Sequence, residues 1–306
     1  MSTSVEVEVE GKRLKLSNLD KVLYPKVGFT KGQVIDFYRR IAPVLLPHLR
    51  GRPLTLKRYP DGVEGQHFYE KQCPSHRPPW VKTALIRTNS KEIDFCLADN
   101  LPTLVWTSNL ADLELHTSLS LAKEIKRPTM MVFDLDPGAP AALPECAEVG
   151  LQLRELLDRL ELEGFPKTSG SKGLQIYVPI NRKTTYDETK PFANAIARYL
   201  EKRRPDQVVS SMKKVLRKGK VFVDWSQNDE HKTTVCVYSL RALERPTVSM
   251  PVTWEEVESV ANDGKSDRIV FDSDAALERI EREGDLFKPV LELKQSLPSL
   301  KDGAAL

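Results

Sequence analysis

An apolar run that ends in two acids constrains the fold of this chain more than any other stretch. Residues 131–135 have the composition of a buried strand, and a Pro-Gly pair at 137–138 ends it. Because residues i and i+2 of a strand share a face, we expect Asp134 and Asp136 to aim two carboxylates at one point. Neighbouring carboxylates repel each other, and a bound divalent cation usually neutralises this repulsion. The alternative is a polar strand end without a metal, since Asp-x-Asp alone is a weak pattern.

A second apolar run repeats this logic further along the chain. Residues 221–225 are expected to form a strand with Asp224 at its far end. If the two strands are neighbours in a sheet, Asp134, Asp136 and Asp224 form one set of three carboxylates. Such a set can hold the two divalent ions that neutralise the attacking and leaving oxygens in nucleotidyl transfer.

The segment 167–173, Lys-Thr-Ser-Gly-Ser-Lys-Gly, lies between an expected helix and an expected strand. Glycines let backbone N–H groups converge, hydroxyls donate hydrogen bonds and lysines neutralise charge, so the segment suits a phosphate. Its spacing is not that of a P-loop, and a solvated turn is the alternative. We expect Ser169 and Lys172 to hold a triphosphate, with Arg217 or Arg241 as further clamps.

Two other segments suit nucleic acid. Between residues 202 and 220 the charged side chains are basic apart from Asp206, which fits a phosphate backbone or, alternatively, a solvated helix end. Phe68 and Tyr69 are adjacent aromatics followed by Lys71, a pattern suited to stacking on bases or to an ordinary half-buried strand.

Composition excludes several classes of protein. The chain has 306 residues, 40% hydrophobic and 29% charged, as a globular domain does, and no run approaches the roughly 18 apolar residues of a membrane span. The first ten residues carry no basic apolar presequence, and the four cysteines are scattered, so we expect reduced thiols and a cytoplasmic protein. Cys73 and His76 have a zinc-like gap, but no second pair stands nearby.

The order of expected strands and helices predicts an α+β fold without internal repeats. We expect one catalytic domain over residues 1–290, built from two interleaved lobes, and a tail or linker remnant at 291–306.

With these motifs in place, the chain resembles the primase-polymerase domain of bacterial ligase D, in the archaeo-eukaryotic primase superfamily. The resemblance covers nearly the whole chain, from about residue 16 to 285. The segments that carry it, in the family's order, are 20–25 (DKVLYP), 51–53 (GRP), 67–72 (HFYEKQ), 115–116 (LH), 132–138 (VFDLDPG), 167–174 (KTSGSKGL), 219–228 (GKVFVDWSQN) and 238–241 (YSLR).

This resemblance implies a primase-type catalytic core of mixed and antiparallel sheets flanked by helices. It implies a template-dependent nucleotidyltransferase that fills gaps and extends DNA ends in nonhomologous end joining. The implied cofactor is Mn²⁺ or Mg²⁺ in a two-metal site, and the substrates are NTPs or dNTPs, with ribonucleotides preferred. The implied partners are gapped or broken DNA with a 5′-phosphate, a DNA ligase and the ring protein Ku, at the nucleoid and without a membrane.

The resemblance also implies roles for individual residues. The acids Asp134, Asp136 and Asp224 match the metal ligands and catalytic residues. The positions that match contacts to the nucleotide are Lys57, Phe68, His116, Ser169, Lys172, Gln175 and Arg241. The positions that match or flank contacts to DNA are Lys21, Lys31, Phe68, Tyr69, Lys71, Lys213, Lys214, Arg217 and Lys220, with Lys21 and Lys31 on the 5′-phosphate.

The chain departs from the family's pattern at two positions. Gln175 stands where the family usually has His; glutamine can donate a hydrogen bond but cannot carry a proton. Leu243 stands where relatives can have a second Arg. No ligase or nuclease module is attached, as expected for a stand-alone enzyme or an excised domain.

Two other functions fit parts of the sequence. Asp-x-Asp also occurs where metal-dependent glycosyltransferases hold a nucleotide sugar, which would leave the 202–220 segment, Lys21 and Lys31 without a role. A non-catalytic nucleic-acid-binding domain would display Phe68 and Tyr69 and ignore metal ions.

Overall fold

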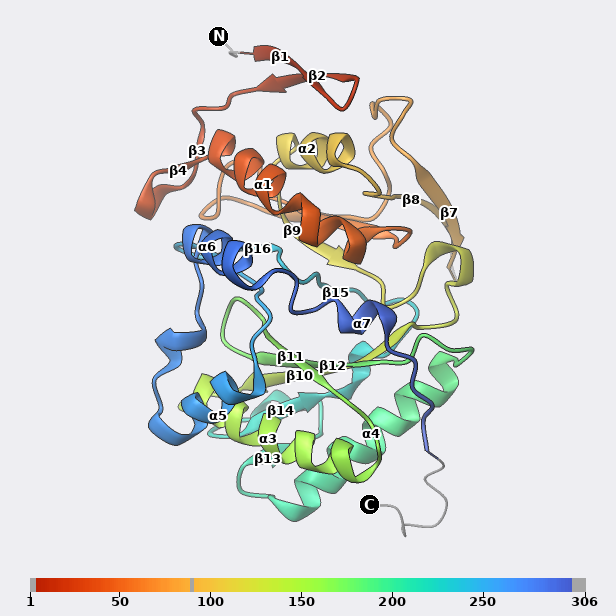
Figure 1. Cartoon of the computed structure of the whole chain (residues 1–306), viewed down its shortest axis with the longest axis vertical. Coiled ribbons are helices and arrows are strands. Elements are labelled where there is room, and N and C mark those ends of the chain that lie inside the picture. The colour runs from red at the N-terminus through yellow and green to blue at the C-terminus, as the bar shows by residue number, and fades with distance from the viewer. Residues whose placement is uncertain (1–3, 89–90, 299–306) are drawn as a thin grey trace. The chain divides into compact units, whose positions relative to one another are not determined.

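The computed structural model describes residues 4–88 and 91–298, and Figure 1 shows the path of the chain. Contacts between Cα atoms divide the chain into two compact units that alternate along the sequence. Unit 1 comprises Met1–Lys123, Thr233–Ser249 and Phe271–Asp285, and unit 2 comprises Glu124–Lys232, Met250–Val270 and Leu286–Leu306. Of the tail expected at 291–306, residues 299–306 lie outside the described residues.

Unit 1 is built on a six-stranded sheet in the order β15-β9-β5-β8-β7, with β6 paired to β5. All of these pairings are antiparallel. The strands are β5 (Leu54–Arg58), β6 (Phe68–Glu70), β7 (Thr83–Arg87), β8 (Glu92–Cys96), β9 (Asp112–Thr117) and β15 (Thr234–Val235). The hairpins are β1 (Ser4–Val9) with β2 (Lys12–Ser17), β3 (Val22–Tyr24) with β4 (Phe29–Thr30), and β16 (Leu240–Ala242) with β17 (Pro246–Val248).

Helices pack beside this sheet in unit 1. They are α1 (Lys31–Leu49), α2 (Leu101–Asn109) and α6 (Ser273–Glu283). Helix α1 begins at a capping box in which Thr30 and Gln33 satisfy each other's backbone N–H groups. It packs against α2, and its buried Tyr38 donates a hydrogen bond to the carbonyl of Leu113 in β9 at 2.7 Å. The helix is thereby fixed to the middle of the sheet.

Unit 2 is built on a five-stranded sheet in the order β11-β12-β10-β14-β13. Its pairings are antiparallel except for the parallel β13–β14 pair. The strands are β10 (Met130–Pro137), β11 (Phe165–Thr168), β12 (Leu174–Pro179), β13 (Val208–Val209) and β14 (Val221–Asp224). The helices are α3 (Leu143–Arg159), α4 (Tyr186–Arg203), α5 (Trp254–Asp263) and α7 (Pro289–Glu292).

The apolar run identified in the sequence is the central strand of unit 2. The first four residues of β10 are buried, and α3 packs against both β10 and β12. Gly173, at the start of β12, lies so close to this strand that a Cβ atom there would be 2.3 Å from the carbonyl oxygen of Leu135. A side chain at residue 173 would therefore push the Ser169–Gly173 turn away from the acid strand.

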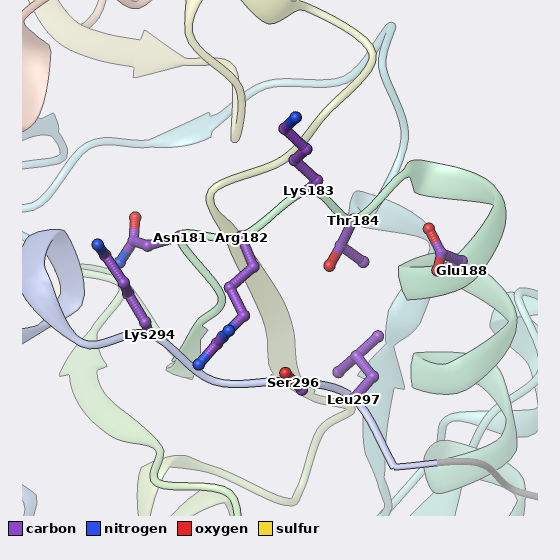
Figure 2. Close-up of a pocket in the computed structure, with 8 residues that line it drawn as sticks. All are labelled: Asn181, Arg182, Lys183, Thr184, Glu188, Lys294, Ser296 and Leu297. Carbon is purple, nitrogen blue, oxygen red and sulfur yellow. The ribbon is translucent and has the colours of Figure 1, made fainter.

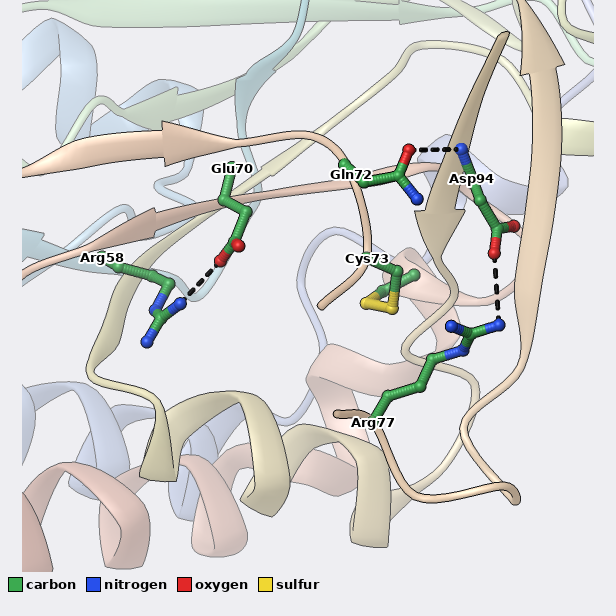
Figure 3. The surroundings of a disulfide bond; sticks show 7 residues. Arg58, Glu70, Gln72, Cys73, Arg77 and Asp94 are labelled. Carbon is green, nitrogen blue, oxygen red and sulfur yellow. Dashed lines mark hydrogen bonds and ion pairs between the residues drawn. A yellow bond between two sulfur atoms is a disulfide. The ribbon is translucent and has the colours of Figure 1, made fainter. Parts of the chain in front are cut away.

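Two of the four cysteines form a disulfide, so the prediction of four reduced thiols is wrong. Cys73 is bonded to Cys96, and Figure 3 shows the surroundings of the bond. The two Cα atoms are 4.9 Å apart. The N–H of Cys73 donates to the carbonyl of Asp94 at 2.7 Å, which lays the segment after β6 beside the end of β8. The separation of 23 residues carries no local sign of this contact.

The disulfide also decides two related expectations. Cys73 uses its sulfur in this bond and so cannot form a zinc site with His76. Cys146 and Cys236 are buried thiols outside this disulfide, but the cysteines as a set no longer argue for a reducing compartment.

The predicted α+β fold class is confirmed, with separate sheets and helices in each unit. Among the described residues, no helix combines the length and the apolar character needed to cross a membrane.

Candidate active site

The three predicted acids lie on neighbouring strands of unit 2, as the sequence indicated. Asp134 in β10 is the direct cross-strand partner of Asp224 in β14, so their side chains share a face of the sheet. Asp136 lies two residues after Asp134 on the same strand and is exposed, whereas Asp224 is buried. The sheet therefore collects three carboxylates at one end of two adjacent strands.

Negative charge at this position is costly in the absence of a cation. Burial, followed by repulsion from Asp136, raises the pKa of Asp134 to about 7, and Asp224 adds to the effect. Gln175 opposes the shift by donating a hydrogen bond from Nε2 to Oδ1 of Asp134 at 3.0 Å. A carboxyl pKa raised this far by burial and by acidic neighbours marks a place where a cation would be stabilised.

Asp224 is fixed by the short helix that follows it, η4 (Trp225–Gln227). Its Oδ1 accepts hydrogen bonds from the N–H of Ser226 at 2.8 Å and from the hydroxyl of Ser226 at 2.5 Å. Its Oδ2 accepts one from Nε2 of Gln227 at 3.0 Å. These bonds hold the carboxylate in one rotamer.

The three carboxylates are ligands that suit a hard divalent ion, and the strand pairing places them on one face of the sheet. Mg²⁺ and Mn²⁺ favour carboxylate oxygens, and Asp134, Asp136 and Asp224 supply them from one face of one sheet. In the part of the chain that the structure describes, no three His, Cys, Asp or Glu side chains lie close enough to enclose an ion as they stand. Metal binding would therefore require movement of at least one of the three acidic side chains.

The predicted phosphate segment is a tight turn in unit 2. The hydroxyl oxygen of Ser169 accepts hydrogen bonds from the N–H groups of Ser171 and Gly173 at 3.2 and 3.1 Å. Lys172 is exposed at the tip of the turn. The first two residues of the predicted segment, Lys167 and Thr168, belong instead to β11 and are buried.

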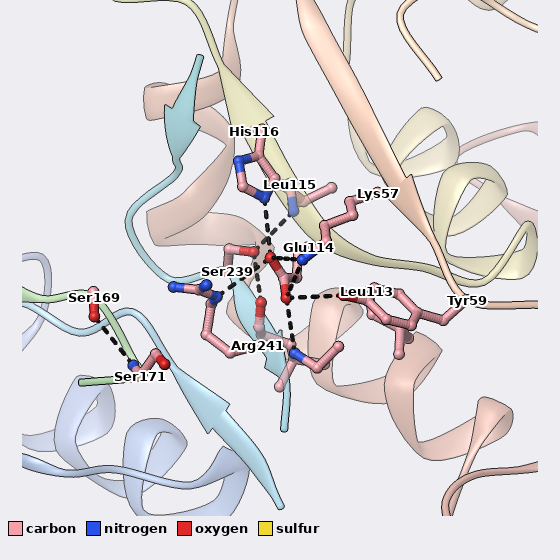
Figure 4. Close-up of polar contacts among 12 residues, drawn as sticks. Lys57, Tyr59, Leu113, Glu114, Leu115, His116, Ser169, Ser171, Ser239 and Arg241 are labelled. Atoms are coloured by element: carbon pink, nitrogen blue, oxygen red, sulfur yellow. Dashed lines mark hydrogen bonds and ion pairs between the residues drawn. The ribbon is translucent and has the colours of Figure 1, made fainter. Parts of the chain in front are cut away.

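Unit 1 contains a cluster of basic side chains around one buried acid, Glu114 in β9 (Figure 4). Lys57 Nζ lies 3.1 Å from both carboxylate oxygens of Glu114. His116 Nε2 and Arg241 Nε lie 3.0 and 3.3 Å from Oε2. The backbone N–H of Ala242 donates to Oε1 at 3.1 Å. Three of the predicted nucleotide contacts are thus gathered on one carboxylate.

Glu114 was not among the predicted site residues. Burial alone would raise the pKa of its carboxyl group, but the hydrogen bond from His116 and the charges of Arg241 and Lys57 hold that pKa well below its usual range. One signal was present in the sequence, because Glu114 lies two residues before His116 and so shares a strand face with it. In the structure Lys57 is the direct partner of Glu114 on β5. The cross-strand pairing could not be read from the sequence.

The two predicted stacking aromatics are exposed on β6. Phe68 and Tyr69 are 43% and 57% exposed, values unusual for rings with no partner surface. The ring of Tyr69 lies 5.4 Å from Lys57 Nζ and 5.6 Å from the His116 ring, and Phe68 lies 5.2 Å from the Arg58 guanidinium. Lys71 follows them on the surface. Tyr69 therefore belongs to the cluster around Glu114, whereas Phe68 stands beside a different cation.

The two lysines expected to bind a 5′-phosphate are both in unit 1. Lys21 is exposed and paired with Asp61 at 2.9 Å. Lys31 is buried and donates to the carbonyl of Ser17 at 2.7 Å. Burial, with smaller contributions from the charges of Lys21 and Arg58, lowers the pKa of Lys31 to about 8.

The basic stretch predicted for DNA lies in unit 2, between β13 and β14. Lys213 and Lys214 are exposed in and before the short helix η3 (Lys214–Leu216). Arg217 donates to the carbonyl of Met212 at 3.0 Å, and its guanidinium lies 3.6 Å from the centroid of the Phe222 ring. Lys220 donates to the carbonyl of Pro205 at 2.5 Å. Between the two strands the exposed residues are 212–216 and 218–219, whereas Arg217 and Lys220 are partly buried.

A separate open cavity of about 590 Å³ in unit 2 contains none of the predicted site residues (Figure 2). Its walls are the start of α4 with the turn before it, and the segment after α7. Its lining residues are Asn181, Arg182, Lys183, Thr184, Glu188, Lys294, Ser296 and Leu297.

The sequence and structure match known proteins over most of the chain. The family model described as the LigD primase-polymerase domain matches residues 30–287. The multifunctional non-homologous end joining protein LigD of Mycolicibacterium smegmatis is 40% identical over 280 residues, which cover 91% of this chain and 36% of that protein. The bifunctional LigD of Bacillus subtilis is 32% identical over 273 residues, or 89% of this chain and 43% of that protein.

A solved structure gives the same result. The polymerase domain from Mycobacterium tuberculosis ligase D in complex with DNA superimposes with a TM-score of 0.85 at 38% identity, covering 92% of this chain and 99% of that one. The chain spans less than half the length of the two LigD proteins above. It belongs to the family of LigD primase-polymerase domains, which are nucleotidyltransferases.

Proposed function

We propose that this protein is a template-dependent polymerase that fills gaps and extends broken DNA ends in nonhomologous end joining. The observation that carries the proposal is the cross-strand pairing of Asp134 with Asp224, with Asp136 two residues along the same strand. The names of the relatives, which are end-joining proteins, and the DNA bound to the solved domain support the choice of substrate.

In this proposal Asp134, Asp136 and Asp224 hold two divalent ions, Mn²⁺ or Mg²⁺. When bound, the ions neutralise charge on the attacking and leaving oxygens and on the triphosphate. The contribution of the protein is to supply carboxylates whose mutual repulsion is relieved by the ions, as the raised pKa of Asp134 indicates. Ser226 and Gln227 limit the movement of Asp224 and so reduce the entropy lost on metal binding.

The remaining predicted residues bind the nucleotide and the DNA. We assign Ser169 and Lys172, and also Lys57, His116 and Arg241, to contacts with the incoming NTP or dNTP. Glu114 keeps the last three side chains ordered, so that binding a phosphate costs little further side-chain entropy. Phe68 and Tyr69 present exposed rings on which the nucleotide base and the template base stack.

The decisive test is primer extension on gapped DNA by the Asp136→Ala variant. Asp136 is exposed, so its removal should leave the fold and DNA binding intact while abolishing incorporation. The assay compares NTPs with dNTPs and titrates Mg²⁺ and Mn²⁺; we expect more product with NTPs and with Mn²⁺. Full extension by Asp136→Ala would rule out the mechanism.

Recognition of the downstream strand has its own test. Lys21 and Lys31 are assigned to its 5′-phosphate, so gapped DNA with this phosphate should bind more tightly than the same DNA with a 5′-hydroxyl. Each lysine–phosphate contact should add about one unit to the log–log slope of affinity against salt. A DNA ligase and Ku are proposed as partners because the relatives are end-joining proteins. Equal affinity for both DNAs would remove the assignment of the two lysines.

A further inference from the structure

Four side chains form one row across four strands of the unit 2 sheet. The register pairs Lys167 in β11 with Gln175 in β12, Gln175 with Asp134 in β10, and Asp134 with Asp224 in β14. Directly paired residues on adjacent strands point to the same face. The row therefore runs from a cation through a neutral amide to two acids.

Hydrogen bonds join the first three members of this row. Lys167 Nζ donates to Oε1 of Gln175 at 2.6 Å, and Nε2 of Gln175 donates to Oδ1 of Asp134 at 3.0 Å. Lys167 is fully buried and Gln175 is 3% exposed, so neither group exchanges these bonds for water easily. Lys167 also lies 5.4 Å from the centroid of the Tyr177 ring. A buried ammonium is costly, which makes its placement here informative.

The direction of each bond is dictated by chemistry. An ammonium group can only donate, so the amide oxygen of Gln175 must face Lys167. The amide nitrogen must then face Asp134, where an ionised carboxylate can only accept. Without Lys167 the amide could rotate by half a turn and present its oxygen to the carboxylate. Lys167 thus selects the one amide orientation that binds Asp134.

The row also separates the cation from the acid. Two strand spacings, about 10 Å between backbones, lie between Lys167 and Asp134. A lysine in direct contact with Asp134 would compete with a metal ion for the carboxylate. With Gln175 interposed, Oδ1 is held in the sheet, and among the described residues no hydrogen bond to Oδ2 is found.

A similar arrangement occurs at the partner acid. Lys232 Nζ donates to the hydroxyl of Ser226 at 2.5 Å, and this hydroxyl donates to Oδ1 of Asp224 at 2.5 Å. Here too a lysine reaches a predicted metal ligand through one neutral side chain. The same order of cation, neutral group and acid therefore occurs twice at one site.

We propose that Lys167 is a positioning residue, which acts through Gln175 to hold the carboxylate of Asp134 in the orientation that binds a divalent ion. This inference rests on the proposed function, because it takes Asp134 as a metal ligand. It gives Gln175 a role inside the sheet and explains why glutamine can replace histidine there. A neutral imidazole can likewise accept from Lys167 at one nitrogen and donate to Asp134 from the other.

The test measures Mn²⁺ binding to the free protein, without DNA or nucleotide, from the electron paramagnetic resonance signal of unbound Mn²⁺. Lys167→Met and Gln175→Met each keep an unbranched side chain and break the row. We expect each to weaken Mn²⁺ binding 10- to 100-fold, the usual effect of losing a partner behind a metal ligand. Gln175→His should stay within about threefold of wild type.

The double variant distinguishes positioning from a general effect of charge. If Lys167 acts through Gln175, Lys167→Met should add nothing to Gln175→Met. The matched control is Lys190→Met, which removes a lysine from the same unit whose partner is Asp229, and it should bind Mn²⁺ as wild type does. Thermal unfolding in EDTA checks that each variant is folded.

Several outcomes would overturn the inference. They are unchanged or tighter Mn²⁺ binding by Lys167→Met, additive losses in the double variant, or a loss in Gln175→His as large as that in Gln175→Met. If Lys167→Met does not fold, the Gln175→Met variant replaces it in the test. A folded Gln175→Met variant that binds Mn²⁺ as tightly as wild type would also overturn the inference. The Asp134→Ala variant separates the two proposals. If Asp134→Ala binds Mn²⁺ as wild type does, both the proposed function and the role of Lys167 are wrong. If Asp134→Ala loses Mn²⁺ binding but the Lys167 and Gln175 variants keep it, only the role of Lys167 is wrong.

Discussion

The two units handle concentrated charge in opposite ways. In unit 1 two cations, Lys57 and Arg241, contact a single buried acid directly, and so does the imidazole of His116, whose pKa is lowered by burial. In unit 2 the acids Asp134 and Asp224 are connected to lysines only through neutral side chains. Direct pairing fixes cations that must stay charged, whereas indirect pairing leaves carboxylate oxygens available to a ligand.

This difference gives the two acids opposite pKa shifts. The pKa of Glu114 is held below its usual range by direct cationic partners, and that of Asp134 is raised to about 7 by burial and by other acids. The buried acid of unit 1 is therefore neutralised by side chains of that unit, whereas the acids of unit 2 are not. The following predictions test this contrast, beginning with the largest expected effect.

Replacing Glu114 with Gln should be the most damaging change in unit 1. It leaves two partly buried cations, Lys57 and Arg241, without their common partner, and breaking a buried pair typically costs about 3–5 kcal/mol. We expect a fall of about 3 kcal/mol in the free energy of unfolding at pH 7.5, measured with urea. The control Glu281→Gln removes an exposed partner of Arg40 and should cost less than about 1 kcal/mol.

The pH dependence of this difference has a definite sign. The pKa of Glu114 is lower in the folded than in the unfolded protein, where it is about 4.3. Its stabilising contribution is therefore complete above about pH 5 and is lost as the pH falls through the folded value. The difference in unfolding free energy between wild type and Glu114→Gln should be constant from pH 6 to 8 and should become smaller in acid. A gap that widens in acid would contradict direct pairing.

The disulfide of unit 1 should have the next largest effect. Closing a loop across 23 residues is worth about 3 kcal/mol in the chain-entropy account. We expect a similar loss of unfolding free energy for Cys73→Ser with Cys96→Ser. Cys236→Ser, which alters a buried cysteine of the same unit outside the disulfide, is the control and should cost less unfolding free energy. If reduction with dithiothreitol leaves wild type as stable as before, the cross-link does not stabilise unit 1.

The contrast between the units also explains what the sequence could reveal. The acid strands were predictable because apolar runs ending in Asp134, Asp136 and Asp224 are local patterns, and the expected neighbouring of the two strands is confirmed. The α+β class was predictable for the same reason. These features depend on periodicities of a few residues.

The features that were missed depend on which distant residues become neighbours. Lys167 looked like part of a phosphate-binding turn, but its place in β11 buries it beside Gln175. Glu114 became the centre of a cluster only through pairing of β9 with β5 and the arrival of Arg241. The Cys73–Cys96 bond likewise joins segments with no local signal. The sequence showed the chemical groups but not their partners.

A smaller effect is expected from Asp134→Asn in EDTA. The pKa of Asp134 is about 7 in the folded protein and about 3.9 unfolded, so this acid favours the folded state below about pH 4 and loses that contribution as the pH rises through 7. The amide that replaces the carboxyl group in the variant carries no charge at any pH. As the pH rises from 4 to 8, the unfolding free energy of the variant should increase by about 1–2 kcal/mol relative to that of wild type. This value is smaller than the full pKa shift would give, because the side chain is partly exposed and solvent screens its charge. Chemical unfolding across this range measures it, and a constant difference would show that unit 2 carries no excess negative charge.

The smallest effect concerns Lys31, a buried cation of unit 1 with a lowered pKa. Burial lowers this pKa to about 8, so the ammonium is charged at pH 7 and increasingly neutral above pH 8. The preference of the protein for gapped DNA with a 5′-phosphate should therefore fall by up to about tenfold between pH 7 and 9, as one charge-assisted contact is lost. Gapped DNA with a 5′-hydroxyl is the matched control, and its affinity should change much less. A preference that stays constant over this range would mean that Lys31 does not bind the phosphate, and that its contact with Ser17 is purely structural.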